Sequence, residues 1–140
     1  MTNWLTWALL SAFFAALTAI LAKLGVAGVD SNLATAIRTT VVLVFAWLLV
    51  VLTRQAGAIP TLSPKNWLFL FLSGLATGLS WLCYFHAIKI GPVSKVAPID
   101  KLSVALVIVF SALFLGEQLT PAKAAGGILI VAGAIVIALG

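Results

Sequence analysis

Residues 4–22 have the sequence WLTWALLSAFFAALTAILA, in which no residue is charged. The hydrocarbon core of a bilayer is about 30 Å thick, and an α-helix that rises about 1.5 Å per residue needs about 20 residues to cross it. This stretch is long enough and apolar enough to do so. It therefore predicts a membrane-spanning helix and an integral membrane protein.

Four further apolar runs follow the first. Those at 66–88 and 124–140 are of similar length and carry no charge, whereas those at 39–53 and 102–116 reach spanning length only when each is extended toward its N-terminus. The prediction is an all-α, polytopic membrane protein with a single five-helix domain over residues 1–140. Its helices are expected at about 4–24, 31–53, 66–89, 93–115 and 121–139.

Extending the two shorter runs draws charged side chains into the membrane. The second helix then contains Arg38, and the fourth contains Asp100 and Lys101. Arg38 and Asp100 lie about 10 Å inside, at 1.5 Å per residue, and Lys101 follows Asp100 in the chain. Ionisable residues at such depth are costly and are usually functional, so these three are candidate substrate-binding residues.

Composition sets the class of protein. Of the 140 residues, 64% are hydrophobic and 8% are charged, against roughly 25% charged in a soluble domain. The net charge of +5 comes from basic residues that sit mostly near the ends of apolar runs, as membrane anchors do, so nucleic-acid binding is not expected. A multi-pass protein of the cell membrane is expected, with the lipid bilayer around it.

An odd number of spans places the two termini on opposite sides of the membrane. The loop-proximal basic residues divide evenly, three on each side, so the positive-inside rule gives no orientation. Either the distribution of Lys and Arg in a single sequence is a weak indicator of orientation, or the protein inserts in both orientations and pairs head-to-tail. The basic residues are Arg54, Lys65 and Lys123 on the N-terminal side and Lys23, Lys89 and Lys95 on the other.

Hydroxyl-bearing residues form stripes on the third and fourth helices. Spacings of four, three and four place the stripe of the third helix within about 60° of one helical face. Such stripes either line a hydrated pocket or bond their own helix carbonyls and permit close packing. Taken as pocket residues, they predict substrate contacts at Ser73, Thr77, Ser80 and Tyr84, at Ser103, and at Trp81 as a stacking partner.

The intramembrane charges admit three interpretations. In the first, Asp100 forms a structural ion pair with Arg38 or with Lys101. In the second, the cation left without a partner contacts the substrate. In the third, Arg38 or Lys101 snorkels, so that its charged end group reaches the membrane interface. Two cations against one anion leave the site basic. The substrate is therefore expected to be anionic or zwitterionic.

The fifth helix is rich in small residues. Gly126 and Gly133 are seven residues apart and fall on nearly the same face. Because lipid gives helices no hydrophobic reason to associate, a small-residue surface supports close van der Waals approach. These two glycines are the predicted dimer interface, and packing against the chain's own helices is the alternative.

Nothing in the sequence predicts catalysis. With one histidine, one cysteine and three carboxylates, no catalytic constellation, phosphate loop or metal-ligand spacing is present. We expect no enzyme activity, no cofactor and no metal site.

Several segments of the chain carry a resemblance to a known family. The stretch from Gly91 to Ser103 and the later Gly116-Glu-Gln-Leu-Thr120, together with Ala34-Thr-Ala-Ile-Arg38, resemble EamA-type members of the drug/metabolite transporter superfamily. Typical members have ten helices in two five-helix repeats, and this chain is similar to a single repeat, as in the half-length bacterial and archaeal branch. The resemblance implies transport of small metabolites or drugs by alternating access.

Three functions are compatible with these features. The first is a secondary transporter that works as an antiparallel homodimer of five-helix halves, since tandem fusion of two odd-numbered units would invert the second. The second is a half that requires a paralogous partner chain. The third is a non-transporting assembly subunit, against which the intramembrane Arg38, Asp100 and Lys101 argue.

Overall fold

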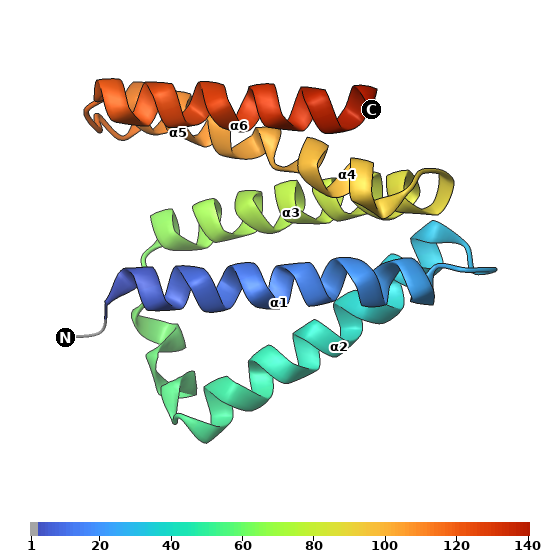
Figure 1. Cartoon of the computed structure of the whole chain (residues 1–140). Helices are drawn as coiled ribbons and strands as arrows, with labels where there is room; N and C mark the ends of the chain where they lie inside the picture. The colour runs from blue at the N-terminus through green and yellow to red at the C-terminus, as the bar shows by residue number, and fades with distance from the viewer. Residues whose placement is uncertain (1–2) are drawn as a thin grey trace. The chain divides into compact units, whose positions relative to one another are not determined.

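The structure, a computed structural model, describes residues 3–140. All regular elements among these residues are helical, and their order along the chain is shown in Figure 1. The helices are α1 (Trp4–Gly25), α2 (Ser31–Leu52), the 3₁₀ helix η1 (Gln55–Thr61), α3 (Pro64–Ile90), α4 (Val93–Asp100), α5 (Leu102–Phe114) and α6 (Pro121–Leu139).

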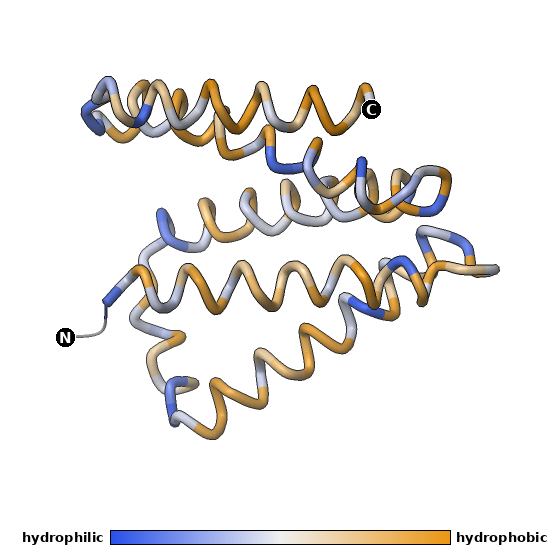
Figure 2. Tube along the Cα trace, viewed as in Figure 1, coloured by the Kyte–Doolittle hydropathy of each residue, from blue (hydrophilic) through white to orange (hydrophobic). Residues whose placement is uncertain are grey.

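Five segments of the described chain are long and apolar enough to cross a membrane, because α4 and α5 together make one span. Figure 2 shows hydrophobic residues along the helices and hydrophilic ones mainly at the turns. Large apolar side chains face outward along every span. Such a surface suits lipid rather than water, and the predicted all-α, five-span membrane fold is confirmed.

Local sequence accounts for where two of the spans begin. The carboxylate of Asp30 accepts backbone N–H bonds from the first turn of α2, and the hydroxyl of Thr120 accepts one from Lys123 in the first turn of α6. Pro121 occupies the first position of α6, where its missing N–H costs nothing. Both helices therefore start at N-caps of the preferred residue types.

The fourth span is not the continuous helix that the sequence predicts. It is interrupted at Lys101, between α4 and α5. The N–H of Lys101 bonds the carbonyl of Pro98 at 3.1 Å, and the N–H of Val104 bonds the carbonyl of Lys101 at 3.0 Å. These are tight i→i+3 bonds of the 3₁₀ type. Pro98, which has no N–H to donate, lies within α4 three residues before Lys101.

The chain divides into two compact groups of residues. The terminal unit comprises the residues up to Lys23 together with Ile90–Gly140, and the central unit comprises Leu24–Lys89. In the terminal unit α6 packs against both α4 and α5, and α5 lies beside α6 in Figure 1.

Two lysines fasten helix ends within the terminal unit. Lys95, in α4, donates through Nζ to the carbonyl of Ala138 near the end of α6, at 3.3 Å. Lys23, near the end of α1, donates to the carbonyl of Gly91 at 2.9 Å. Ammonium groups satisfy orphan carbonyls at helix C-termini and interact favourably with the helix dipole. We call these two contacts the lysine clamps.

Burial in the central unit is concentrated at one end. Its buried residues lie near the start of α2 and the end of α3, and they include the polar Ser31 and Thr35. The hydroxyl of Thr35 bonds the carbonyl of Ser31 at 2.8 Å, so it enters this small core without an unpaired group. The apolar members are Val26, Phe85 and Ile88.

Candidate functional site

Arg38 stacks on aromatic rings. Its Cζ atom lies over the ring of Trp81, 4.4 Å from the centroid, and 5.3 Å from the centroid of the Phe85 ring. Trp81 and Phe85 are one helical turn apart on α3 and therefore present one continuous surface to the guanidinium. This cation–π contact joins α2 to α3, and we call it the arginine stack.

The arginine stack contributes to holding the central unit together. Arg38 is the eighth residue of α2, so its backbone lies about 10 Å along the helix. A cation–π contact is worth about 0.5–1 kcal/mol when exposed to water and about 2 kcal/mol or more when water is excluded. Arg38 is half-buried, so a value of about 0.5–2 kcal/mol is expected for this contact.

The other two intramembrane charges meet at the break in the fourth span. Nζ of Lys101 lies 3.2 Å from Oδ2 of Asp100, with the side chains 57% and 35% exposed in the isolated chain. The hydroxyl of Ser103 donates to the carbonyl of Asp100 at 2.8 Å. The break therefore carries an ion pair, which we call the break pair, and a backbone carbonyl satisfied by a side chain.

Of the pairings that the sequence allowed for Asp100, the structure forms the one with Lys101. Arg38 belongs to the central unit and Asp100 to the terminal unit, so an ion pair between them stays a prediction. Substrate contact by either cation also stays a prediction.

The hydroxyl stripe of α3 is largely uncovered. Ser73, Thr77 and Ser80 are exposed, and Tyr84 is half-buried, as is Trp81 beside the stripe. The hydroxyl of Thr77 bonds the carbonyl of Ser73 at 2.8 Å, which is the helix-internal bond that the packing interpretation expects. That bond leaves the oxygen of Thr77 able to accept a hydrogen bond from a ligand. A role of the stripe in substrate binding remains a prediction.

Asp30 stands outside the spans, at the start of α2. Its Oδ1 accepts N–H bonds from Asn32 at 2.9 Å and from Leu33 at 3.3 Å. These bonds favour the charged carboxylate and lower its pKa below the ordinary value, and the positive charges of Lys89 and His86 add to the effect. The bonds anchor the end of α2 that leads to Arg38.

The two faces of α6 differ in their surroundings. Gly127 and Ala134 are buried, and a Cβ atom added to Gly127 would lie 3.3 Å from Cδ1 of Ile108 in α5. By contrast, a Cβ atom added to Gly126 or Gly133 would meet nothing within 4 Å. Packing within the terminal unit therefore uses the face of Gly127. The face of Gly126 and Gly133 is left open, and its predicted role as a dimer interface is untested.

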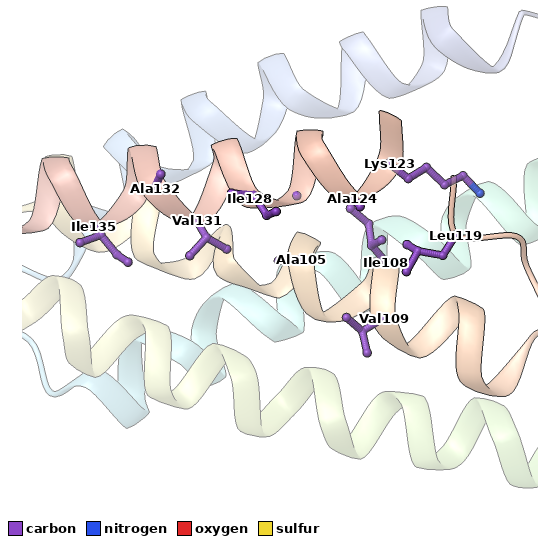
Figure 3. A pocket seen from close by; sticks show the side chains of 11 residues that line it. Ala105, Ile108, Val109, Leu119, Lys123, Ala124, Ile128, Val131, Ala132 and Ile135 are labelled. Carbon is purple, nitrogen blue, oxygen red and sulfur yellow. The ribbon is translucent and has the colours of Figure 1, made fainter. Parts of the chain in front are cut away.

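A groove of about 440 Å³ runs between α5 and α6. Figure 3 shows Leu119 and Lys123 at one of its ends and Ile135 at the other. Apolar side chains line nearly all of it. Lys123 is engaged elsewhere, with its Nζ 3.3 Å from Glu117 Oε2 and 3.2 Å from the carbonyl of Gln118, so the groove offers no free charge to a polar ligand.

Sequence reasoning missed Phe85 as a partner of Arg38 and missed both lysine clamps. The four-residue spacing between Trp81 and Phe85 was visible, but nothing in it shows which neighbouring helix the pair faces. No cluster of His, Cys, Asp or Glu suited to a metal ion occurs within residues 3–140.

Relatives of this chain are membrane transporters. The model of the EamA-like transporter family matches residues 2–139. A Sinorhizobium protein named "Uncharacterized transporter in cobO 3'region" is 50% identical over 137 residues, which cover 98% of this chain and 97% of that protein. No protein of solved structure matches the chain.

Two longer relatives match over part of their length. The pseudopaline exporter CntI of Pseudomonas aeruginosa is 37% identical over 90 residues, which cover 64% of this chain and 31% of the exporter. The uncharacterized transporter YvbV of Bacillus subtilis is 36% identical over 103 residues, 74% of this chain and 34% of its own length. The family match spans nearly all of this chain, and the five spans agree with it. The chain therefore belongs to the EamA-like transporter family, as a single repeat, and is a multi-pass membrane transporter of the cell membrane.

Proposed function

We propose that this chain is one half of a secondary transporter for a small molecule, and that two copies pair antiparallel and work by alternating access. The observation that carries the proposal is the interrupted fourth span, with the break pair at the interruption. Transporters commonly build their sites from discontinuous helices, because unwound backbone and charged groups inside the membrane can bind a substrate.

The packing of the terminal unit supports a hinge at Lys101. On one side of the break, α4 is tied to the end of α6 by the Lys95 clamp. On the other side, α5 packs against the N-terminal half of α6, where a Cβ atom added to Gly127 would lie 3.3 Å from Cδ1 of Ile108. Because the 3₁₀ turn at Lys101 already departs from α-helical geometry, a small backbone rotation there would change the direction of α4 without breaking an ideal helix.

The number of spans supports the proposed antiparallel pairing. Five spans leave the termini on opposite membrane sides, and loop-proximal basic residues balance three against three. A single population of chains inserted both ways supplies both halves. We propose the open face of α6, with Gly126 and Gly133, as the surface along which they meet.

The substrate is proposed to be anionic or zwitterionic, since Arg38 and Lys101 exceed Asp100 in charge. The similarity of the chain to a pseudopaline exporter supports a metabolite as cargo. The proposed substrate contacts are Arg38, Ser73, Thr77, Ser80, Trp81 and Tyr84 in the central unit and Asp100, Lys101 and Ser103 in the terminal unit.

Metabolite profiling tests transport even while the substrate is unidentified. Cells that express the wild-type chain are compared with cells that express Asp100→Asn at equal membrane abundance, and small molecules are quantified in cells and medium. We expect at least one metabolite whose cell-to-medium ratio changes with the wild type alone. Identical profiles would contradict the proposed transport.

Reporter fusions at Gly140 test the pairing. Labelling on both sides of the membrane supports antiparallel homodimers. Labelling on a single side would contradict insertion in both orientations and would favour a partner chain of opposite orientation.

A further inference from the structure

Within the central unit, Arg38 has no carboxylate to pair with. Asp30 is the one carboxylate between Leu24 and Lys89. It lies eight residues before Arg38 on the same helix, which is about 12 Å at 1.5 Å per residue. Its Oδ1 already accepts two backbone N–H bonds at the helix start.

The remaining carboxylates of the chain are each paired with a lysine. Asp100 lies 3.2 Å from Lys101, and Glu117 lies 3.3 Å from Lys123. All three carboxylates of the chain therefore have partners other than the guanidinium. Within the central unit, Arg38 is therefore an intramembrane cation that has aromatic rings beside it and no anion.

The arginine stack restricts the guanidinium without using its hydrogen-bond donors. A guanidinium is planar, and it contacts aromatic rings through its face while its five N–H groups point outward in its own plane. The rings of Trp81 and Phe85 lie 4.4 and 5.3 Å from Cζ of Arg38, and neither ring has an acceptor oxygen for the N–H groups. Rigid placement of such an edge reduces the entropy lost when it binds an oxyanion.

We propose that the edge of Arg38 binds the carboxylate of a small organic monocarboxylate. Two parallel N–H donors match the two oxygens of a carboxylate in a bidentate pair. One negative charge neutralises the single unbalanced cation, whereas a phosphate ester would leave surplus negative charge in the membrane. Phe85 is a positioning residue in this arrangement. The inference rests on the proposed function, in that the bound acid is the transported molecule.

Fluorescence of Trp81 provides a direct test of binding. Trp4, Trp7, Trp47 and Trp67 are replaced by Phe, and the full chain is held in nanodiscs of phosphatidylcholine. Sodium acetate then replaces sodium chloride at constant ionic strength. Acetate is small enough to enter a pocket whose shape is matched to a larger acid, and neutral acetamide has nearly the same size.

Acetate is expected to change the emission of Trp81 saturably, and acetamide is expected to leave it unchanged. Arg38→Gln should weaken the apparent affinity about tenfold or more, because a charged hydrogen-bonded pair is lost. The affinity of Arg38→Lys should lie between those of the parent protein and Arg38→Gln, since lysine keeps the charge but lacks the two parallel N–H donors of a guanidinium. The matched control is Arg54→Gln, at the loop arginine, which should titrate like the parent.

Phe85→Leu keeps the charge of Arg38 and an apolar side chain, so it tests positioning even if Arg38→Gln does not fold. It should weaken acetate binding less than Arg38→Gln does. Equal responses to acetate and acetamide, or unchanged affinity in both Arg38→Lys and Phe85→Leu, would overturn the inference.

Binding and transport can fail separately. A chain that changes metabolite ratios in cells but does not distinguish acetate from acetamide retains its proposed function and loses this inference. A chain that binds acetate through Arg38 but transports nothing retains the site and loses the function.

Discussion

The two units of the chain bring charge into the membrane in different ways. In the central unit a single cation lies in the unbroken helix α2 and stacks on the rings of Trp81 and Phe85. In the terminal unit two opposite charges are adjacent in sequence, pair with each other, and coincide with a break in the span.

This difference shows what each arrangement leaves available. An ion pair cancels its own charge, so the break pair makes an irregular backbone tolerable inside a membrane. Aromatic rings stabilise a cation but do not neutralise it. Arg38 in the arginine stack therefore keeps its full positive charge and can attract an anion. The break pair therefore suits a segment that changes conformation, and the arginine stack suits a residue that binds an anion.

The largest expected effect comes from unbalancing the break pair. Asp100→Asn leaves Lys101 without its anion inside the span, which should cost up to about 2.5–3.5 kcal/mol on an insertion scale. The melting temperature of the purified protein should therefore fall sharply. Asp100→Asn with Lys101→Gln removes both charges and should recover most of that stability but not transport. If the double variant melts as low as the single one, the pair does not balance charge.

A large side chain introduced on either face of α6 tests which face packs within the terminal unit and which face is open to a second copy. Gly127→Leu inserts a side chain against Ile108 and should cost about 1–3 kcal/mol, as overpacking does. Gly133→Leu, on the open face of the same helix, should leave the melting temperature unchanged and reduce dimer content and transport. Size-exclusion chromatography with light scattering distinguishes the two. A Gly133→Leu protein that remains dimeric and active would remove this face from the interface.

A smaller loss is expected in the arginine stack. Trp81→Leu removes the better aromatic partner of Arg38 and should destabilise the protein by about 0.5–2 kcal/mol. Adding Arg38→Gln to it should cost less than Arg38→Gln alone, because only the contact with Phe85 is then left to lose. Melting curves of the two single variants and the double variant form a cycle that isolates the contact. Strictly additive effects would show that Arg38 and Trp81 do not interact.

The smallest effect concerns pH and the cap of α2. Because the folded chain lowers the pKa of Asp30 below its ordinary value of 3.8, its stabilising contribution is present above that value. The contribution is lost as the pH falls through the lower, folded value. Asp30→Asn keeps the cap and should show a shallower loss of melting temperature in acid. Identical acid profiles for both proteins would contradict a role for the charge of Asp30.

The spans and several of their ends could be predicted because they depend on local properties. Length and charge alone identify the apolar runs, and caps such as Asp30 and Thr120 mark where helices start. The interruption at Lys101 was missed because a run of 22 apolar-rich residues satisfies the length of a span whether or not it is continuous. Pro98, three residues earlier, was the available signal.

Contacts between helices could not be predicted, because a sequence shows what lies on one face but not what faces it. Gly126 with Gly133 and Gly127 with Ala134 are both seven-residue pairs of small residues, and only the second pair is buried. Arg38 likewise could be recognised as an intramembrane cation, whereas its aromatic partners come from another helix.

The Lys95 clamp has a consequence for biogenesis. Its acceptor, Ala138, lies 43 residues further along the chain, so it is synthesised after Lys95. Throughout that interval the ammonium of Lys95 is free to interact with anionic lipid headgroups and to influence the orientation of the nascent chain. Only when α6 has crossed the bilayer can the same charge become a helix-end contact, which makes completion of the last helix the step that fixes α4 in place.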